Sequence, residues 1–273
     1  MVENIAEMMQ HLFIQRAVLV GVLISLCAAL LGVSLVLKRY SMIGDGLSHV
    51  GFGILTIATA CGATTPLYVA IPCVTISAIV LLKIGNNSRI KSDSAIALIS
   101  SSALAIGVAA TSLTTGMNTD VCNFMFGSIL AMSQADVILS IIVGLIVAVL
   151  FIVYYRKLFV VTFDENFAKA SGLKANRYTN IIAVLTALII VVGMRMMGVM
   201  LISSIIIFPA LTSMRIFKSF KKVIISSAII SVISFLIGIY LSYIYNISTG
   251  AMIVIVNLVL FILFTIIEKI IRE

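Results

Sequence analysis

Charged side chains are scarce in this 273-residue sequence: Asp, Glu, Lys and Arg make up 10% of it, whereas 62% is hydrophobic. The mean hydropathy is +1.26. A soluble domain keeps about a quarter of its residues charged, because its surface faces water. This scarcity excludes a soluble protein. The longest polar stretch, from Arg156 to Tyr178, leaves no room for a separate soluble domain.

Motifs for catalysis are also absent. Without a GxxxxGK[ST] phosphate-binding loop, the chain does not bind and hydrolyse ATP by that route. An HExxH zinc-protease motif is missing too, and the two histidines, His11 and His49, are too far apart to build one. We therefore expect no enzyme. The cysteines lack CxxC spacing and are interpreted as structural thiols: Cys27, Cys61, Cys73 and Cys122.

The sequence does contain a series of apolar runs of about 20 residues, each long enough to cross a hydrocarbon core ~30 Å thick. Backbone groups in lipid need hydrogen-bond partners within their own segment, so each run is expected to be helical. The sequence therefore predicts an all-α polytopic bundle, with residues 1–273 forming one transmembrane domain. The predicted spans are 12–37, 41–62, 66–84, 94–115, 136–155, 178–197, 198–214, 223–244 and 250–268.

Basic residues account for the net charge of +8, and they gather in the short connections between the apolar runs. This distribution is typical of the positive-inside rule and indicates contact with lipid headgroups, not with nucleic acid. If every basic cluster is cytoplasmic, the number of spans is odd and the N-terminus lies outside. An even number, about eight, with both termini inside would place Lys38 and Arg39 on the outer side or within the protein.

An acid and an imidazole lie four residues apart in the segment KRYSMIGDGLSHVGFG. On a helix, Asp45 and His49 share one face and are about 6 Å apart along the axis, with Ser48 beside them. A carboxylate oxygen and an imidazole nitrogen are suitable ligands for zinc and, less tightly, for manganese. Because two ligands make an incomplete site, the pair fits an ion in transit better than a stored one.

Two other interpretations of Asp45 and His49 remain open from spacing alone. They could form an intramembrane ion pair with no ligand, or Lys38 and Arg39 could neutralise Asp45 from one to two turns away. A charged group at mid-depth costs roughly 2.5–3.5 kcal/mol on insertion scales, so any of these roles requires compensation.

The polar loop at 162–177 predicts a short helix. Asp164 can cap its N-terminus, Glu165 complements the helix dipole, and Gly172 suits the position after its last turn. An apolar side would come from Phe163, Phe167, Ala168 and Leu173. Such a helix either rests on the membrane surface or inserts into a groove of a soluble partner.

Several isolated residues are assigned simpler roles. Arg195 is expected to reach a membrane interface, Pro209 to kink or end its helix, and Asp93 to cap the start of a span. Asp120 is predicted to be outside, as a possible interaction residue, and His11 to be interfacial.

With these residues assembled, the chain resembles the permease subunits of the zinc/manganese/iron ABC importers, the ABC-3 family. The matching segments occur in family order: LLGVSLVLKRYSMIGDGLSHVGFG at 30–53, RIKSDSAIAL at 89–98, FMFGSILAMSQADV at 124–137, TFDENFAKASGLKANR at 162–177 and MMGVMLISSIIIFPALTSMR at 196–215. The resemblance implies the importer permease fold with about eight helices (seven to nine) and a multi-pass location in the bacterial plasma membrane. It also implies a homodimer with cytoplasmic ATP-binding subunits and an extracytoplasmic metal-binding protein.

By the same resemblance, Asp45 and His49 are implicated as metal ligands in the pathway, and Asp164, Glu165, Phe167, Ala168 and Gly172 belong to the segment that couples to the ATPase. The expected function is import of zinc or manganese by alternating access, with ATP hydrolysed by the partner and no permanently bound cofactor. A proton-coupled secondary metal transporter, which would use the Asp and His as a relay, is the alternative. A purely structural membrane subunit would have no reason to hold this pair.

Overall fold

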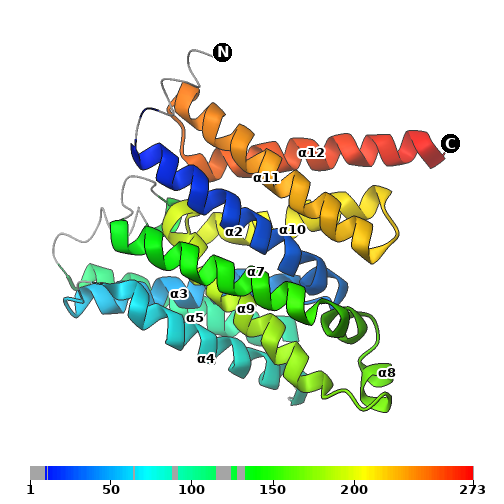
Figure 1. The fold of residues 1–273 in the computed structure, drawn as a ribbon. Coiled ribbons are helices and arrows are strands. Elements are labelled where there is room, and N and C mark those ends of the chain that lie inside the picture. The colour runs from blue at the N-terminus through cyan, green and yellow to red at the C-terminus, as the bar shows by residue number, and fades with distance from the viewer. Residues whose placement is uncertain are drawn as a thin grey trace.

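The computed structural model describes residues 10, 12–63, 65–87, 92–114, 124–127 and 133–272. Every long regular element within these ranges is an α-helix, as the apolar runs predict. The described residues form nine long helices and the short α8, and Figure 1 shows their arrangement. Their bounds are α2 (Leu12–Leu37), α3 (Ser41–Ala60), α4 (Pro66–Asn87), α5 (Ser92–Ser112), α7 (Gln134–Phe163), α8 (Glu165–Ala170), α9 (Ala175–Met197), α10 (Val199–Ile216), α11 (Phe220–Tyr245) and α12 (Thr249–Arg272).

The long helices match the predicted spans closely, with one clear exception. The prediction ended the fifth span at residue 155, whereas α7 continues for 30 residues to Phe163. At 1.5 Å per residue α7 is about 45 Å long, so its last turns extend past a hydrocarbon core of ~30 Å. Arg156 and Lys157 are thus helical residues at the end of a span, and not loop residues.

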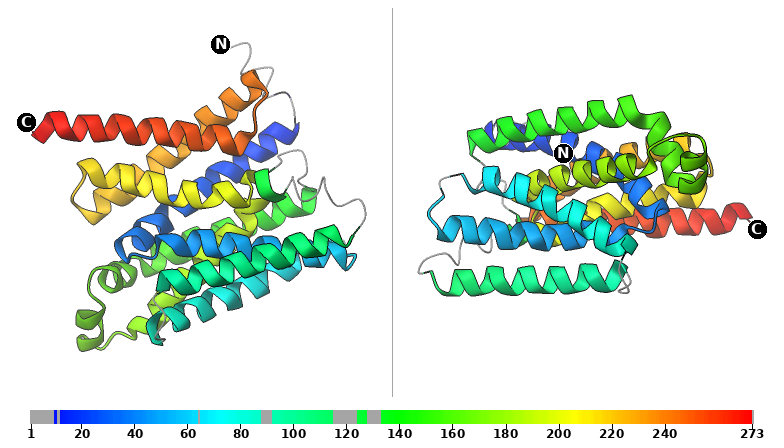
Figure 2. Two further views of the ribbon diagram at one scale, coloured as in Figure 1. Left: turned by 180° about the vertical axis from the view of Figure 1, so that it is seen from behind. Right: turned by 90° about the horizontal axis from the view of Figure 1, so that it is seen from below.

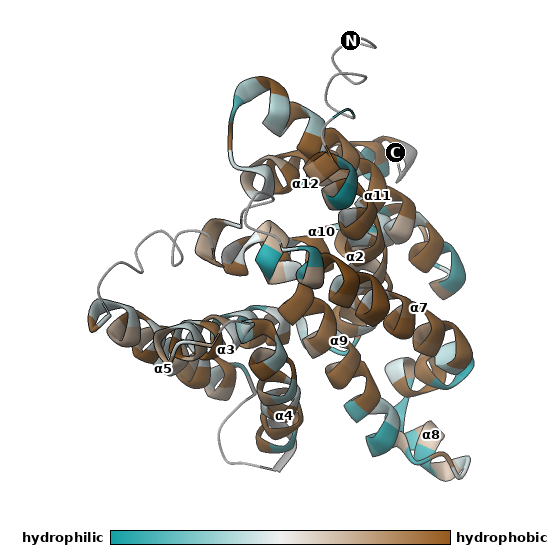
Figure 3. Ribbon diagram, turned by 60° about the vertical axis from the view of Figure 1, so that its left-hand side comes forward, coloured by the Kyte–Doolittle hydropathy of each residue, from teal (hydrophilic) through white to brown (hydrophobic). Residues whose placement is uncertain are grey.

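Seven of the described helices are long and apolar enough to cross a membrane. The two other long helices are α3, which carries Asp45 and His49, and α10, whose apolar part is the shorter stretch Leu201–Ile216. Figure 3 shows hydrophobic residues along the helices and hydrophilic ones gathered around α8 and the adjacent start of α9. The pattern fits a multi-pass membrane protein.

Consecutive long helices run antiparallel, and the start of α2 and the end of α12 lie at opposite ends of the bundle (Figures 1 and 2). One end holds the α2–α3 turn, α8, the α10–α11 turn and the end of α12, and we call it the basic end. Lys38 belongs to it, because its Nζ lies 3.5 Å from Glu165 Oε2. This arrangement of the described helices fits the interpretation with an odd number of spans. Lys38 lies within the protein, with its side chain only 7% exposed.

The centre of the bundle is formed by α2 and α9. In their most apolar stretches, 67% and 72% of the residues are buried. Helix α2 packs closely on two neighbours. A Cβ at Gly32 would overlap the carbonyl oxygen of Ile206 on α10, and Ser231 of α11 donates a 2.8 Å hydrogen bond to the carbonyl oxygen of Ser25. Small side chains allow such backbone approach within a membrane, where lipid supplies no hydrophobic force between helices.

Candidate functional site

The site helix α3 begins at a tight turn at the basic end. Arg39 has a φ of +60°, in the left-handed region, and the Tyr40 N–H donates to the Leu35 carbonyl at 2.8 Å. Helix α3 then packs closely against α5: a Cβ at Gly53 would lie 2.6 Å from the Ala103 carbonyl oxygen, and one at Gly46 would lie 2.6 Å from Ile96 Cγ2. The glycines of this segment therefore allow close contact between α3 and α5.

Asp45 and His49 lie on one face of α3, as their spacing predicts. His49 Nε2 is 3.7 Å from Asp45 Oδ2, and the side chains are 15% and 38% exposed, respectively. This distance suits an ion pair but exceeds that of a direct hydrogen bond. Ser48 does not join the pair: its hydroxyl donates to the backbone carbonyl of Asp45 at 2.7 Å.

The second ring nitrogen of His49 is unusual. Nδ1 is buried and has no hydrogen-bond partner in the described part of the chain. An imidazole nitrogen left in this way costs free energy, because it has lost water without gaining a protein partner. Nδ1 is thus enclosed by packing, and Nε2 is the nitrogen that faces Asp45.

Lys38 does not neutralise Asp45. Its Nζ donates to Thr179 Oγ1 at 2.8 Å and pairs with Glu165 at 3.5 Å, so its charge is directed at α8 and α9. No third His, Cys, Asp or Glu joins Asp45 and His49 to form a cluster among the described residues. This chain therefore offers one carboxylate and one imidazole, which is half of a tetrahedral ligand set.

The predicted coupling segment is a six-residue helix, α8, with the expected ends. The Asp164 side chain accepts from the Phe167 N–H at 2.9 Å, and Gly172 has a φ of +80° just after the C-cap Ser171. The apolar side of α8 is only partly buried. Ala168 is fully buried, in a small cluster with two residues of α7 and α9, whereas Phe167 is 60% exposed.

The charge on α8 has two partners. Glu165 Oε1 lies 3.0 Å from Lys169 Nζ within the helix, and Oε2 faces Lys38, the residue that follows α2. The hydrogen bond from Lys169, followed by the charge of Lys38, lowers the pKa of Glu165 below its usual 4.5, although partial burial opposes this. Burial lowers the pKa of Lys38, and Glu165 partly offsets that effect.

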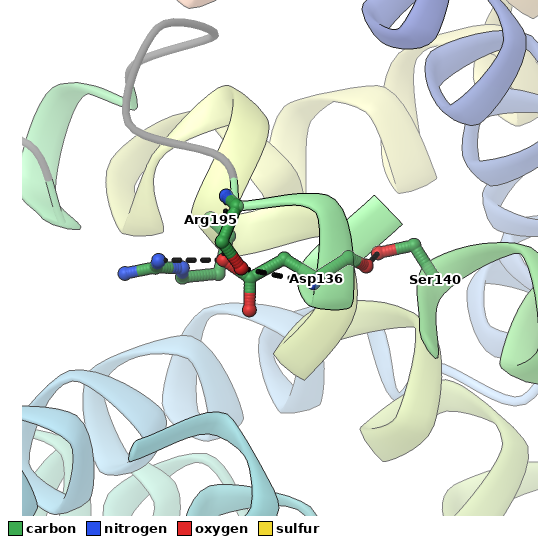
Figure 4. A network of polar contacts seen from close by, with 4 residues as sticks. Asp136, Ser140 and Arg195 are labelled. Carbon is green, nitrogen blue, oxygen red and sulfur yellow. Dashed lines mark hydrogen bonds and ion pairs between the residues drawn. The ribbon is translucent and has the colours of Figure 1, made fainter. Parts of the chain in front are cut away.

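One ion pair was missed at the opposite end of the bundle. Arg195 was expected only to reach an interface, but Figure 4 shows it paired with Asp136, at 2.8 Å. Asp136 also completes a capping box with Ser133 at the start of α7, and the Arg195 guanidinium lies 5.4 Å from the centre of the Phe124 ring. The S-x-x-D spacing of Ser133 and Asp136 resembles a capping box and could have been found in the sequence.

Other assignments also change. Asp93 lies in the first turn of α5, which begins at Ser92, so it complements the helix dipole and is not the cap. Pro209 lies inside α10, which continues to Ile216, so it does not end the helix. His11 and Asp120 lie outside the described residues.

The sequence model of the ABC 3 transport family matches residues 10–268, which is nearly the whole chain. The chain belongs to this family. It is similar to the manganese transport system membrane protein MntC of Halalkalibacterium halodurans, with 29% identity over 93% of this chain and 87% of that protein. It is also similar to the high-affinity zinc uptake system membrane protein ZnuB of Haemophilus influenzae, with 31% identity over 90% and 94%.

Among solved structures, a chain of PsaBC from Streptococcus pneumoniae in complex with Fab has a TM-score of 0.86 and 29% identity, covering 96% of this chain and 94% of that chain. Family membership and shared fold identify this ABC-3 protein as the membrane permease of an ABC importer. It is a multi-pass subunit and not itself the ATPase.

Proposed function

We propose that this permease carries a divalent transition metal, manganese or zinc, into a bacterial cell, and that Asp45 and His49 are its ligands during transit. The observation that supports this proposal is the 3.7 Å Asp45–His49 pair on α3, in which the Asp45 side chain is 38% exposed. The similarity to proteins named for manganese and for zinc supports the same class of cargo.

The chemistry of the pair suits release as well as binding. Oxygen and nitrogen ligands accept both metals, and a site with two ligands per chain binds more weakly than a closed structural site. In a homodimer whose α3 helices face each other, two copies would supply up to four ligands. The ion could then pass from water to protein ligands and back without a deep energy well.

The orientation of the permease in the membrane follows from the charges. The basic end faces the cytoplasm by the positive-inside rule, so α8 faces the ATP-binding subunits and the α9–α10 end faces an extracytoplasmic metal-binding protein. The exposed aromatic rings of Phe163 and Phe167, 58% and 60% exposed, are suited to fill a pocket on the ATPase subunit.

The test is metal uptake by proteoliposomes that contain the permease and its ATPase, measured by elemental analysis with manganese and with zinc. Asp45→Asn and His49→Gln keep polar side chains but replace the carboxylate and the imidazole with weaker amide ligands, so uptake should fall to near the background level. Asp93→Asn removes an exposed carboxylate elsewhere at the basic end and serves as the matched control.

Two outcomes would contradict the proposal. One is undiminished uptake by the Asp45 and His49 variants at normal abundance in the membrane. The other is uptake driven by an imposed pH gradient without ATP, which would indicate a proton-coupled secondary transporter.

A further inference from the structure

A buried lysine connects the coupling helix to the helix that holds the candidate ligands. The Lys38 side chain is only 7% exposed, although it follows directly after a membrane span. Its ammonium group contacts Glu165 of α8 at 3.5 Å and Thr179 of α9 at 2.8 Å. Burying an ammonium group is unfavourable unless it is paired, so the position of Lys38 depends on these two partners.

The chain around Lys38 is stiff. Three backbone hydrogen bonds close the turn between α2 and α3: Arg39 N–H to the Val36 carbonyl at 3.1 Å, Tyr40 N–H to Leu35 at 2.8 Å, and Ile43 N–H to Tyr40 at 3.0 Å. Helix α3 starts at Ser41, and Asp45 lies one turn later. A displacement of Lys38 would therefore also move the first residues of α3, because these hydrogen bonds hold the α2–α3 connection rigid.

The rest of α8 is held differently. Ala168 packs on Val161 of α7 and Ala175 of α9. This apolar contact, unlike a hydrogen bond or ion pair, does not depend on a particular orientation of the groups. Lys169, the second partner of Glu165, is 52% exposed and belongs to α8 itself. The Glu165–Lys38 pair is thus a directional contact from α8 to the turn before α3.

We propose that Lys38 is a positioning residue that transmits movement of α8 to α3, so that the ATPase cycle acts on the Asp45–His49 pair through Glu165 and Lys38. This inference rests on the proposed function for its link to metal transport. The link between α8 and α3 itself does not depend on the identity of the cargo.

The test uses the complete complex of permease and ATPase in nanodiscs. Lys38→Met removes the charge, keeps the apolar stem, and leaves Glu165 paired with Lys169, so folding should be preserved. Lys38→Arg keeps the charge and should restore function. Lys157→Met is the matched control, because Lys157 is an exposed lysine at the same end whose ammonium lies over the rings of Tyr154 and Tyr178.

Two readouts separate this inference from the proposed function. The first is hydrogen exchange at residues 41–45 with and without ATP, which requires no metal. ATP should change the exchange in the unsubstituted protein, in Lys38→Arg and in Lys157→Met, but not in Lys38→Met. The second is stimulation of ATPase activity by the metal-loaded binding protein, which should fall about fivefold or more in Lys38→Met, the lower end of typical coupling.

Glu165→Gln should give the same loss of stimulation. The Lys38→Met/Glu165→Gln double variant should lose no more than Lys38→Met alone, because both changes break the same contact.

The inference is overturned if ATP still changes exchange at residues 41–45 in Lys38→Met. It is equally overturned if Lys38→Met no longer retains the ATPase subunit during purification, since Lys38 would then only shape the docking surface. Absence of metal stimulation in the unsubstituted complex, with the exchange response intact, would count against the proposed function alone.

Discussion

Arg195 and Asp136 form a 2.8 Å ion pair that fastens the end of α9 to the start of α7. Their side chains are 17% and 13% exposed, so most of each charge is out of water. The partners are 59 residues apart in the sequence. The pair fixes the end of the bundle opposite the basic end, just before the α9–α10 junction.

Breaking this pair should destabilise the protein. Arg195→Gln leaves the Asp136 carboxylate largely buried without its cation, and we expect a loss of about 3 kcal/mol in the free energy of unfolding. The Arg195→Gln/Asp136→Asn double variant should recover part of the loss, since no unpaired charge remains. Thermal unfolding in detergent measures both. Equal stability of Arg195→Gln and the unsubstituted protein would show that the pair contributes nothing.

Gly198 should not tolerate a side chain. It joins α9 to α10 with a φ of +88°, and a Cβ there would lie 2.5 Å from the Met125 carbonyl oxygen. Gly198→Ala therefore combines backbone strain with an overlap, and we expect a lower unfolding temperature and a loss of about 2 kcal/mol or more.

Gly172→Ala is the matched control for Gly198→Ala. Its φ is +80°, but nothing lies within 4 Å of the added Cβ. Only the strain of about 1–2 kcal/mol remains, and it is confined to the end of α8. If both variants unfold at the same temperature, the overlap at Gly198 has no effect.

Phe167→Ala should weaken association with the ATPase subunit without changing the stability of the permease. The ring is 60% exposed, so its removal leaves no cavity in the bundle, whereas an aromatic anchor at an interface is worth roughly 2 kcal/mol or more. Copurification of the ATPase measures the effect. Ile152→Ala, at a 69% exposed position within α7, is the control and should retain the subunit. Full retention in Phe167→Ala would remove this ring from the docking surface.

Acid pH should loosen α8. The pKa of Glu165 is lowered from 4.5 by the hydrogen bond from Lys169 and by the nearby Lys38 charge. A lowered carboxylate pKa contributes stability that is present above pH 4.5 and is lost as the pH falls through the lowered value. Hydrogen exchange of α8, corrected for the intrinsic pH dependence, should therefore accelerate below about pH 4.5. In Glu165→Gln this additional acceleration should disappear; its persistence would assign it to another group.

Much of the fold could be predicted from the sequence, because a bilayer of fixed thickness demands apolar helices of fixed length. The starts of α2, α3 and α4 at residues 12, 41 and 66 were predicted without any knowledge of packing. The cap of Asp164 and the left-handed Gly172 were also predictable, since both depend on neighbours within one or two turns. The placement of Asp45 and His49 on one face follows from helical periodicity alone.

The partners of the charged groups were decided by the tertiary structure. Lys38 meets Thr179, 141 residues later, and Arg195 meets Asp136 across another helix. Periodicity and capping describe a helix by itself, whereas these contacts depend on which helices pack together and at what height. For that reason the ends of α8 at Asp164 and Gly172 could be predicted from the sequence. The contact between Glu165 of α8 and Lys38, just before α3, depends on how the helices pack and could be found only in the tertiary structure.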